Sequence, residues 1–356
     1  MELHVATRKG LFVVRPGSNQ PVGQPSFLGD PVTAVLHDRR DGTLYAALNL
    51  GHFGRKLHRS TDGGASWAEL PAPAFDKVEG KEDGPSVSLV WTLEAGGDEQ
   101  PGRLWAGTIP GALFRSDDHG ESWQLVRSLW DLPQRKNWFG GGYDDPGIHS
   151  ILVDPRDSRR VECGVSCGGV TISEDDGASW RQTGHGFVAD YVPPEQASEP
   201  STQDPHRVQA CSANPNVQWC QHHSSVYRST DGGDNWTELT EAKPSRFGFA
   251  VAAHPHDPET AWFVPGIKDE RRVPVDGKLV VSRTRDGGKS FEILSNGLPT
   301  EPSFDLIYRH ALDIDDTGEC LAMGSTTGNL WISENGGDEW RLVSNFLPPV
   351  YQVSFA

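Results

Sequence analysis

The chain has 356 residues, which is enough for one large domain or two ordinary ones. It carries 32 Lys and Arg against 49 Asp and Glu, and the resulting net charge of −17 argues against binding to nucleic acid or to an anionic membrane through bulk charge. No apolar run approaches the roughly 18 residues of a membrane-spanning helix, and residues 1–10 lack the shape of a signal peptide, so we expect a cytoplasmic protein.

The residue pattern is typical of an all-β chain with many turns. There are 40 Gly and 26 Pro, and short β-branched and aromatic runs alternate with clusters of Gly, Asp, Asn and Pro. The first two such runs, 3–7 and 10–14, predict a pair of strands. The five cysteines form an odd, small set, which fits reduced thiols better than a disulfide framework.

From residue 60 onward one short motif recurs along the chain. Three copies fit S-x-D-x-G-x-S-W, and three later copies fit it more loosely. The acidic position recurs at steps of 49 to 57 residues, which is the signature of a repeat architecture. The six copies are 60–67, 116–123, 173–180, 229–236, 284–291 and 333–340.

The motif resembles the Asp-box, or BNR, repeat of the sialidase-like β-propellers, including bacterial BNR-repeat glycosyl hydrolases. The resemblance covers nearly the whole chain and implies four-stranded blades, with each motif in the turn between the third and fourth strands. The Asp side chain suits such a turn because it accepts backbone N–H bonds, and the second Gly suits a positive φ. The Trp is expected to fill the gap between neighbouring blades. In the resembled family these turns lie on the periphery, so we interpret them as structural.

The motif also sets the phase of the rest of the chain. A seventh blade is split between the ends, with 3–7 and 10–14 as its second and third strands and 350–355 as its inner strand. We therefore expect a single domain over 1–356, a seven-bladed propeller of four-stranded antiparallel blades that is closed by pairing of the C-terminal strand with the N-terminal strands. The six complete blades are predicted at 32–70, 86–126, 148–182, 206–240, 246–294 and 306–343.

The predicted phase places several histidines on one face of the ring. His149 and His206 begin inner strands, His222 and His223 end a second strand, and His52 lies in a loop between second and third strands. Antiparallel order puts the start of the first strand and the end of the second at the same end of a blade. Three long loops enter the inner strands at this face, and long loops are often functional. These loops are 71–85, 127–147 and 183–205.

Three of these histidines are a candidate metal site. His149, His206 and His222 offer a reasonable ligand set for Zn²⁺ or another divalent transition metal. Asp144 or Asp145 would complete the shell or act as a base. Two alternatives stay open: the histidines share a polar pocket without a metal, or their roles are unrelated.

Aromatic and basic residues are further candidates for the same face. Trp130, Trp138, Phe139 and Tyr143 lie in the 127–147 loop, where they would stack on a sugar or pack beneath the loop. Arginines near inner strands would hold a carboxylate through two hydrogen bonds, although solvation is the commoner arrangement. The substrate-binding candidates are His52, Trp138, His149, His206, His222 and Arg309, and the catalytic candidates are Asp144, Asp145 and Arg246.

Cys211 and Cys220 flank the turn at 214–216 and are expected to face each other across a hairpin. A shared metal, a disulfide and two buried thiols are the possibilities. The expected reducing compartment favours thiols.

Three classes of function compete. The first is a glycoside hydrolase that acts on a small molecule or glycan through two carboxylates, drawn from Asp144, Asp145, Glu195 and Asp305. A sialidase is not expected, because the chain lacks the N-terminal F/Y-R-I-P motif and has seven repeats rather than six. The second class is a non-catalytic ligand-binding or assembly scaffold, since fold alone does not select a function. The third is a metal-dependent enzyme that uses the histidines.

Overall fold

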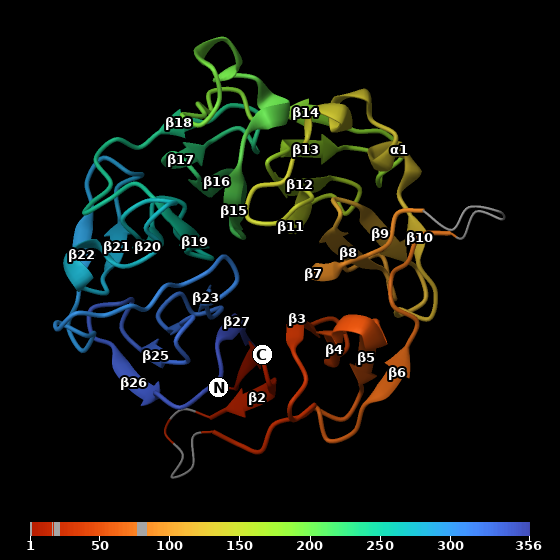
Figure 1. Ribbon diagram of the computed structural model, residues 1–356, viewed down its shortest axis with the longest axis horizontal. Coiled ribbons are helices and arrows are strands. Elements are labelled where there is room, and N and C mark those ends of the chain that lie inside the picture. The colour runs from red at the N-terminus through yellow and green to blue at the C-terminus, as the bar shows by residue number, and fades with distance from the viewer. Residues whose placement is uncertain (1, 16, 18–21, 77–83) are drawn as a thin grey trace.

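The computed structural model describes residues 2–15, 17, 22–76 and 84–356. Seven antiparallel sheets are arranged in a ring around a common axis, and the chain visits them in order (Figure 1). In the six complete blades the innermost strand comes first in the chain and the outermost comes last (Figure 1). The predicted all-β, seven-bladed propeller is confirmed.

The strands of the six complete blades follow the phase that the motif predicts. The first three blades consist of β3 (Val32–Asp38), β4 (Thr43–Asn49), β5 (Arg55–Ser60) and β6 (Ala68–Leu70); β7 (Leu89–Ala95), β8 (Leu104–Ile109), β9 (Leu113–Ser116) and β10 (Gln124–Leu125); and β11 (Gly147–Val153), β12 (Val161–Ser166), β13 (Gly169–Ser173) and β14 (Arg181–Thr183). The next three consist of β15 (Pro205–Cys211), β16 (Asn214–His222), β17 (Val226–Ser229) and β18 (Thr237–Glu238); β19 (Gly248–Ala253), β20 (Ala261–Pro265), β21 (Val281–Thr284) and β22 (Glu292–Leu294); and β23 (Leu312–Ile314), β24 (Leu321–Gly324), β25 (Leu330–Ser333) and β26 (Arg341–Ser344). Each motif therefore joins the third strand of a blade to the fourth.

The seventh blade closes the ring from both ends of the chain. β1 (Leu3–Thr7) pairs with β2 (Gly10–Val14) on one side and with β27 (Val350–Phe355) on the other. Among the described residues this sheet has three strands, and the fourth position is filled by a segment that contacts β2 through the bridges Leu11–Ser26 and Val14–Val22. The predicted closure by the C-terminal strand is confirmed.

The repeated turn is held by a short hydrogen-bond network of its own residues. In the third copy, Ser173 Oγ donates to Asp175 Oδ1 over 2.8 Å and accepts the N–H of Gly177 over 2.8 Å. The same Asp175 carboxylate accepts the N–H and the hydroxyl of Ser179. The first-position hydroxyl and the third-position acceptor oxygen keep these bonds even where Thr284 replaces Ser and Asn335 replaces Asp, although in the last copy Glu339 bonds Asn335 through its backbone N–H.

The glycine at the fifth position of the turn packs against the neighbouring blade in some copies, so a substitution there probes this packing. Gly288 has a φ of +89°, and an added Cβ would lie 2.6 Å from Leu239 Cδ1 of the preceding blade. Gly63, at the fourth position of the first copy, also has a positive φ, but nothing lies within 4 Å of its added Cβ. We expect Gly288→Ala to lower the free energy of unfolding by about 2–4 kcal/mol and Gly63→Ala by about 1 kcal/mol, since only the first combines strain with overpacking. Urea unfolding measures both variants, and equal losses would contradict this packing.

Apolar side chains fill the spaces between blades. Trp105 and Leu113 of the second complete blade pack in one cluster with Ile148 and Val161 of the third. Trp180 of the third repeated turn packs against the same cluster, as the motif predicts for its indole. The inner strands are thus held in place by the cores on both sides of each blade, which fixes the loops at the two faces of the ring.

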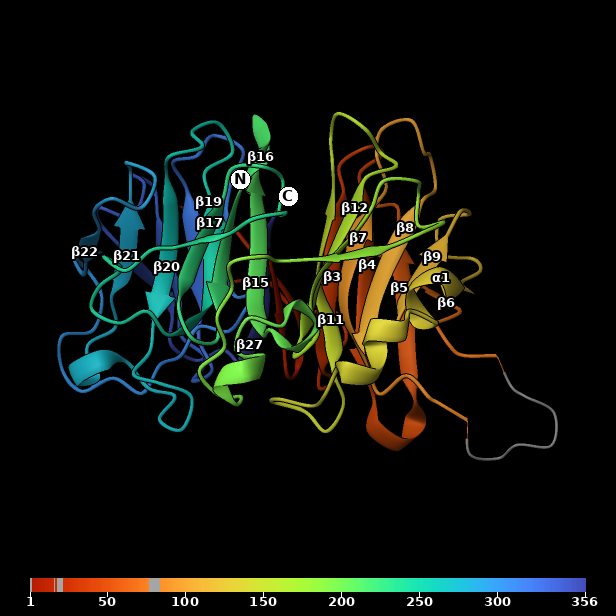
Figure 2. The same ribbon diagram turned by 90° about the horizontal axis from the view of Figure 1, so that it is seen from above.

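The short helical segments all lie in connecting loops. Figure 2 shows most of them on one face of the ring, opposite the face where both chain ends lie. These segments are α1 (Arg127–Trp130), η1 (Gly51–Phe53), η2 (Pro133–Asn137), η3 (Pro194–Gln196), η4 (Pro200–Thr202) and η5 (Val275–Gly277). Within the described residues, no helix has the length and apolar character needed to cross a membrane.

The cysteines are all free thiols. Cys220 is paired in register with Val208, and Cys211 with Asn214. The expectation that Cys211 and Cys220 face each other is therefore wrong: an irregularity in the register, between Ala210 and Cys211, offsets the two ends of the hairpin. Burial raises the pKa of the Cys220 thiol, which keeps it protonated and unreactive.

Candidate functional site

A β-bulge recurs near the start of the inner strands. In four blades the register skips one residue close to the first pair, and in β19 it shifts in the same region. Bulges redirect a side chain and are common beside functional sites. Three of the skipped residues form a side-chain hydrogen bond with a backbone carbonyl of the next blade: Thr33 with Val90, His149 with Pro205 and His206 with Gly248. The skipped residues in the four blades are Thr33, Trp91, His149 and His206.

A cavity of about 600 Å³ opens at the face where these inner strands begin. We call it the mouth cavity, and its volume lies in the range of small-molecule sites. Trp91 of β7 and Tyr143 of the 127–147 loop meet edge to face there, with ring centroids 5.3 Å apart. The lining also includes Asp144 and Asp145 of the same loop, and aromatic and basic side chains from other blades, namely Tyr308, Tyr351, Arg272 and Arg309.

Arg309 reaches across the ring between opposite blades. Its guanidinium carbon lies 4.8 Å from the ring centroid of Trp91 and 5.4 Å from that of Phe249. Within the described residues it forms no ion pair, and its Nε is buried without a hydrogen-bond partner. Burial lowers the pKa of this guanidinium, which nonetheless stays charged at neutral pH. Arg309 thus presents an unpaired cation to the mouth cavity. This location is the one expected of a binding residue, the role predicted for Arg309 from the sequence.

The predicted carboxylates separate into two groups. Asp144 and Asp145 are exposed and line the mouth cavity. Glu195 is exposed in η3. Asp305 is held by Ser303, Thr327 and Asn329, and although burial raises the pKa of Asp305, these hydrogen bonds hold it below the usual value. The location of Asp144 and Asp145 is therefore compatible with substrate contact, whereas Asp305 is part of a local turn.

Three other candidates do not line the mouth cavity. Arg246 is paired with Glu238 of the outer strand β18. His52 is exposed in η1, where its ring lies 3.9 Å from that of Phe53. Trp138 is 8 % exposed and belongs to the core cluster between two blades, so it packs beneath its loop, which was one of its two expected roles.

The predicted histidine trio does not gather at one point. His149 is fully buried, with Nε2 2.7 Å from the Pro205 carbonyl oxygen and Nδ1 3.0 Å from Ser150 Oγ. His222 is also fully buried and stacks on Phe187. Both have structural hydrogen bonds, since His222 Nε2 accepts the N–H of Asp204 over 3.2 Å. Among the described residues, the ligand atoms that lie within 4.8 Å of one another belong instead to Asp204, His206 and His223.

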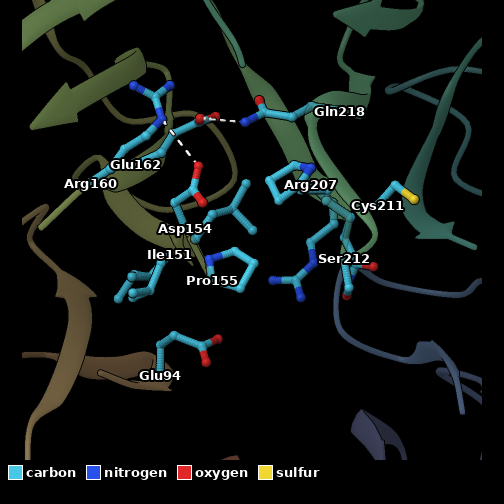
Figure 3. A pocket seen from close by; sticks show the side chains of 15 residues that line it. Glu94, Ile151, Asp154, Pro155, Arg160, Glu162, Arg207, Cys211, Ser212 and Gln218 are labelled. Carbon is cyan, nitrogen blue, oxygen red and sulfur yellow. Dashed lines mark hydrogen bonds and ion pairs between the residues drawn. The ribbon is translucent and has the colours of Figure 1, made fainter. Parts of the chain in front are cut away.

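A second cavity of about 310 Å³, whose lining Figure 3 shows, lies where the inner strands β11 and β15 end and is therefore at the face opposite the mouth cavity. Glu162 Oε2 accepts a hydrogen bond from Gln218 Nε2 over 2.8 Å, while Glu94 lies on the other side of the cavity (Figure 3). Burial raises the pKa of Glu94 and of Glu162 to about 7. Arg207 lines the same cavity and acts on Glu94 as a positive charge, and burial lowers the pKa of Arg207 to about 10. This cavity combines carboxyl groups that titrate near neutrality with a buried arginine.

Several residues in and beside the two cavities were not predicted from the sequence. Trp91 carries a signal in the repeat phase, because Thr33, Trp91, His149 and His206 recur at nearly equal steps in successive inner strands. Asp204 stands two residues before His206 and was not considered as a ligand. Glu94 and Glu162 carry no comparable signal, since their burial depends on the packing of neighbouring blades.

Comparisons with known proteins give distant likenesses. No protein-family model matches the chain. An oligoxyloglucan-reducing end-specific xyloglucanase of Emericella nidulans is 24% identical over 312 residues, which is 79% of this chain and 35% of that protein. A xyloglucanase of a Paenibacillus species is 32% identical over 145 residues, 36% of this chain and 13% of that protein. The chain therefore spans about a third or less of the curated relatives it matches.

Solved structures show the same architecture. The GH74 xyloglucanase of Xanthomonas campestris has a TM-score of 0.64 at 18% identity, covering 96% of this chain and 52% of that one. The structure of YCF48 bound to D1 peptide has a TM-score of 0.53 at 15% identity, covering 94% and 92% of the two chains. The chain is thus a seven-bladed β-propeller that has xyloglucanases among its sequence relatives and its structural neighbours.

Proposed function

We propose that the mouth cavity binds a glycan and that the protein is a glycosidase-type propeller acting on a β-glucan such as xyloglucan. The observation that carries the proposal is the composition of the mouth cavity, which is lined by four aromatic side chains together with Asp144 and Asp145. Aromatic faces pack on the apolar faces of sugar rings, and glycoside hydrolysis ordinarily uses two carboxyl groups. The xyloglucanases among the relatives support the choice of substrate class.

Binding is the first test of this proposal. Trp91→Ala and Tyr143→Ala are each expected to weaken the binding of a xyloglucan oligosaccharide about tenfold or more, because each removes a ring from the cavity wall. Isothermal titration calorimetry measures the affinity. Phe139→Ala is the matched control, since Phe139 lies in the same loop, is partly exposed and does not line the cavity. Equal affinities of all four proteins would contradict glycan binding at the mouth.

Hydrolysis is tested separately through the two aspartates. The double variant Asp144→Asn, Asp145→Asn keeps the shape of the loop but removes both carboxylates from the mouth cavity. We expect the release of reducing ends from xyloglucan to fall at least 100-fold, because neither the acid nor the base role can then be filled. Glu195→Gln is the control, since that exposed carboxylate lies outside the lining. Undiminished activity of the double variant would exclude these aspartates as the catalytic pair.

One observation favours a binding module as a second candidate. The peptide-bound YCF48 structure matches this chain over nearly the full length of both, whereas the xyloglucanases are far longer. The unpaired guanidinium of Arg309 could hold the terminal carboxylate of a peptide. Two results together would support this candidate over the glycosidase. The protein would bind a peptide with a free C-terminal carboxylate but not the C-terminal amide of the same peptide, and it would not bind xyloglucan.

A further inference from the structure

A buried carboxylate lies between two imidazoles beside the mouth cavity. Asp204 precedes β15, His206 is in β15, and His223 follows β16; the backbone N–H of His223 donates to the carbonyl of Asp204 over 2.9 Å. Asp204 Oδ2 lies 3.4 Å from His206 Nε2 and 3.3 Å from His223 Nδ1. The three ligand atoms lie within 4.8 Å of one another, and Asp204 and His206 are buried while His223 is partly exposed.

The hydrogen bonds of His206 determine which of its nitrogens carries a proton. Nδ1 lies 2.6 Å from the carbonyl oxygen of Gly248, which can only accept, so Nδ1 is the protonated nitrogen. In the neutral ring, Nε2 then directs a lone pair at Asp204 Oδ2. Two facing lone pairs are unfavourable unless a cation lies between them.

The surroundings of Asp204 and His206 match those of metal ligands. The Nδ1–H of His206 is bonded to a backbone carbonyl, as is usual for a metal-bound imidazole. Asp204 Oδ1 accepts hydrogen bonds from Ser166 Oγ and the N–H of Cys167, each over 3.1 Å, which leaves Oδ2 for another partner. Zn–N and Zn–O bonds of about 2.0–2.1 Å place tetrahedral ligand atoms about 3.4 Å apart. The observed 3.4 and 3.3 Å separations fit such a tetrahedron.

We propose that Asp204, His206 and His223 bind one divalent transition-metal ion, with Zn²⁺ the best fit to two imidazole nitrogens and one carboxylate oxygen. Three protein ligands leave a fourth position for water or a ligand group. The loop that carries Asp144 and Asp145 passes directly over the site, since a Cβ added to Gly141 would lie 3.8 Å from Asp204 Oδ2. The site therefore lies beneath the loop whose residues Gly142 and Tyr143 line the mouth cavity.

Charged side chains near the proposed metal site have opposite effects on its affinity for a cation. Arg309 acts on Asp204 as a positive charge and weakens the attraction for a metal ion, whereas Asp190 and Asp269 act on His223 as negative charges. Replacing Arg309 by Met removes the opposing cation and is expected to tighten metal binding. A site that needed only a proton between Asp204 and the imidazoles would show no such gain in metal affinity.

Metal binding tests the proposal independently of glycan binding. Untagged protein is stripped with a chelator and titrated with Zn²⁺, and with Co²⁺, whose absorption bands report tetrahedral geometry. We expect one ion per chain, a tetrahedral Co²⁺ spectrum, and at least 100-fold weaker binding by His223→Gln and Asp204→Asn. Both variants are checked for an unchanged circular dichroism spectrum, and His223→Gln, at a partly exposed position, keeps the hydrogen bonds of the buried pair.

The control is His52→Ala, because His52 is exposed and remote from the group. It is expected to bind one ion with the affinity of the unaltered protein. The proposal is overturned if the unaltered protein binds no ion, or if His223→Gln binds as tightly as the His52→Ala control. Either result would leave a proton, rather than a metal, between Asp204 and its two imidazoles.

Discussion

Deletion of residues 350–356 abolishes cooperative folding or lowers the free energy of unfolding by several kcal/mol, because the pairing of β1 with the inner strand β27 is lost. β27 contributes the buried side chains of Val353 and Phe355 to the core between blades. It also joins three blades: the Gln352 amide bonds both the N–H and the carbonyl of Val35, and the Phe355 N–H donates to Asp313 Oδ2.

A point variant separates closure from a general effect of shortening the chain. Gln352→Leu leaves the strand in place but leaves the N–H and carbonyl of Val35 without their partner, at a cost of about 1–3 kcal/mol. Deletion of Ala356 alone removes a single backbone bond to Glu2 and serves as the control. Thermal unfolding followed by circular dichroism measures all three proteins. An unchanged transition after deletion of 350–356 would show that the ring does not depend on its C-terminal strand.

Glu162→Gln raises the stability of the protein at alkaline pH and leaves it unchanged in acid. Burial raises the pKa of Glu162 to about 7 against a usual 4.5, with the hydrogen bond from Gln218 opposing part of the effect. Below pH 4.5 the folded and unfolded chains both hold the proton. Between pH 4.5 and 7 the unfolded chain releases it while the folded chain retains it, so folding is progressively penalised as the pH rises.

The size of this effect follows from the difference between the two pKa values. At about 1.4 kcal/mol for each pH unit, the variant gains on the order of 3 kcal/mol above pH 7, because glutamine has no proton to release. Urea unfolding at pH 4, 6 and 8 measures the gain. Glu334→Gln, at an exposed position, is the control and is expected to show no pH-dependent difference. A gain of equal size at pH 4 and pH 8 would mean that the carboxyl group of Glu162 is not held protonated.

The blades could be predicted from sequence because their signal is local. The repeated turn is fixed by side chains two to four residues apart, such as Ser173, Asp175 and Ser179, so the residues that fold it are the residues that repeat. The split seventh blade was predictable for the same reason, since its strands keep the repeat phase after the turn motif is lost.

The site was harder to predict because it depends on register and on contacts between blades. A bulge changes where the inner-strand side chains point, and it gives His149 a carbonyl partner in the next blade. Trp91 occupies the equivalent bulge and faces Arg309, a contact between blades that are far apart in sequence. Asp204 joins His206 and His223 only because the ends of β15 and β16 meet.

The most direct test of the mouth cavity as the functional site is a crystal structure of the protein soaked with a xyloglucan oligosaccharide. We expect electron density for sugar rings against Trp91 and Tyr143, with a hydroxyl or glycosidic oxygen near Asp144 or Asp145. Sugar bound instead at the opposite cavity beside Glu94 and Glu162, with the mouth cavity free of it, would contradict the account.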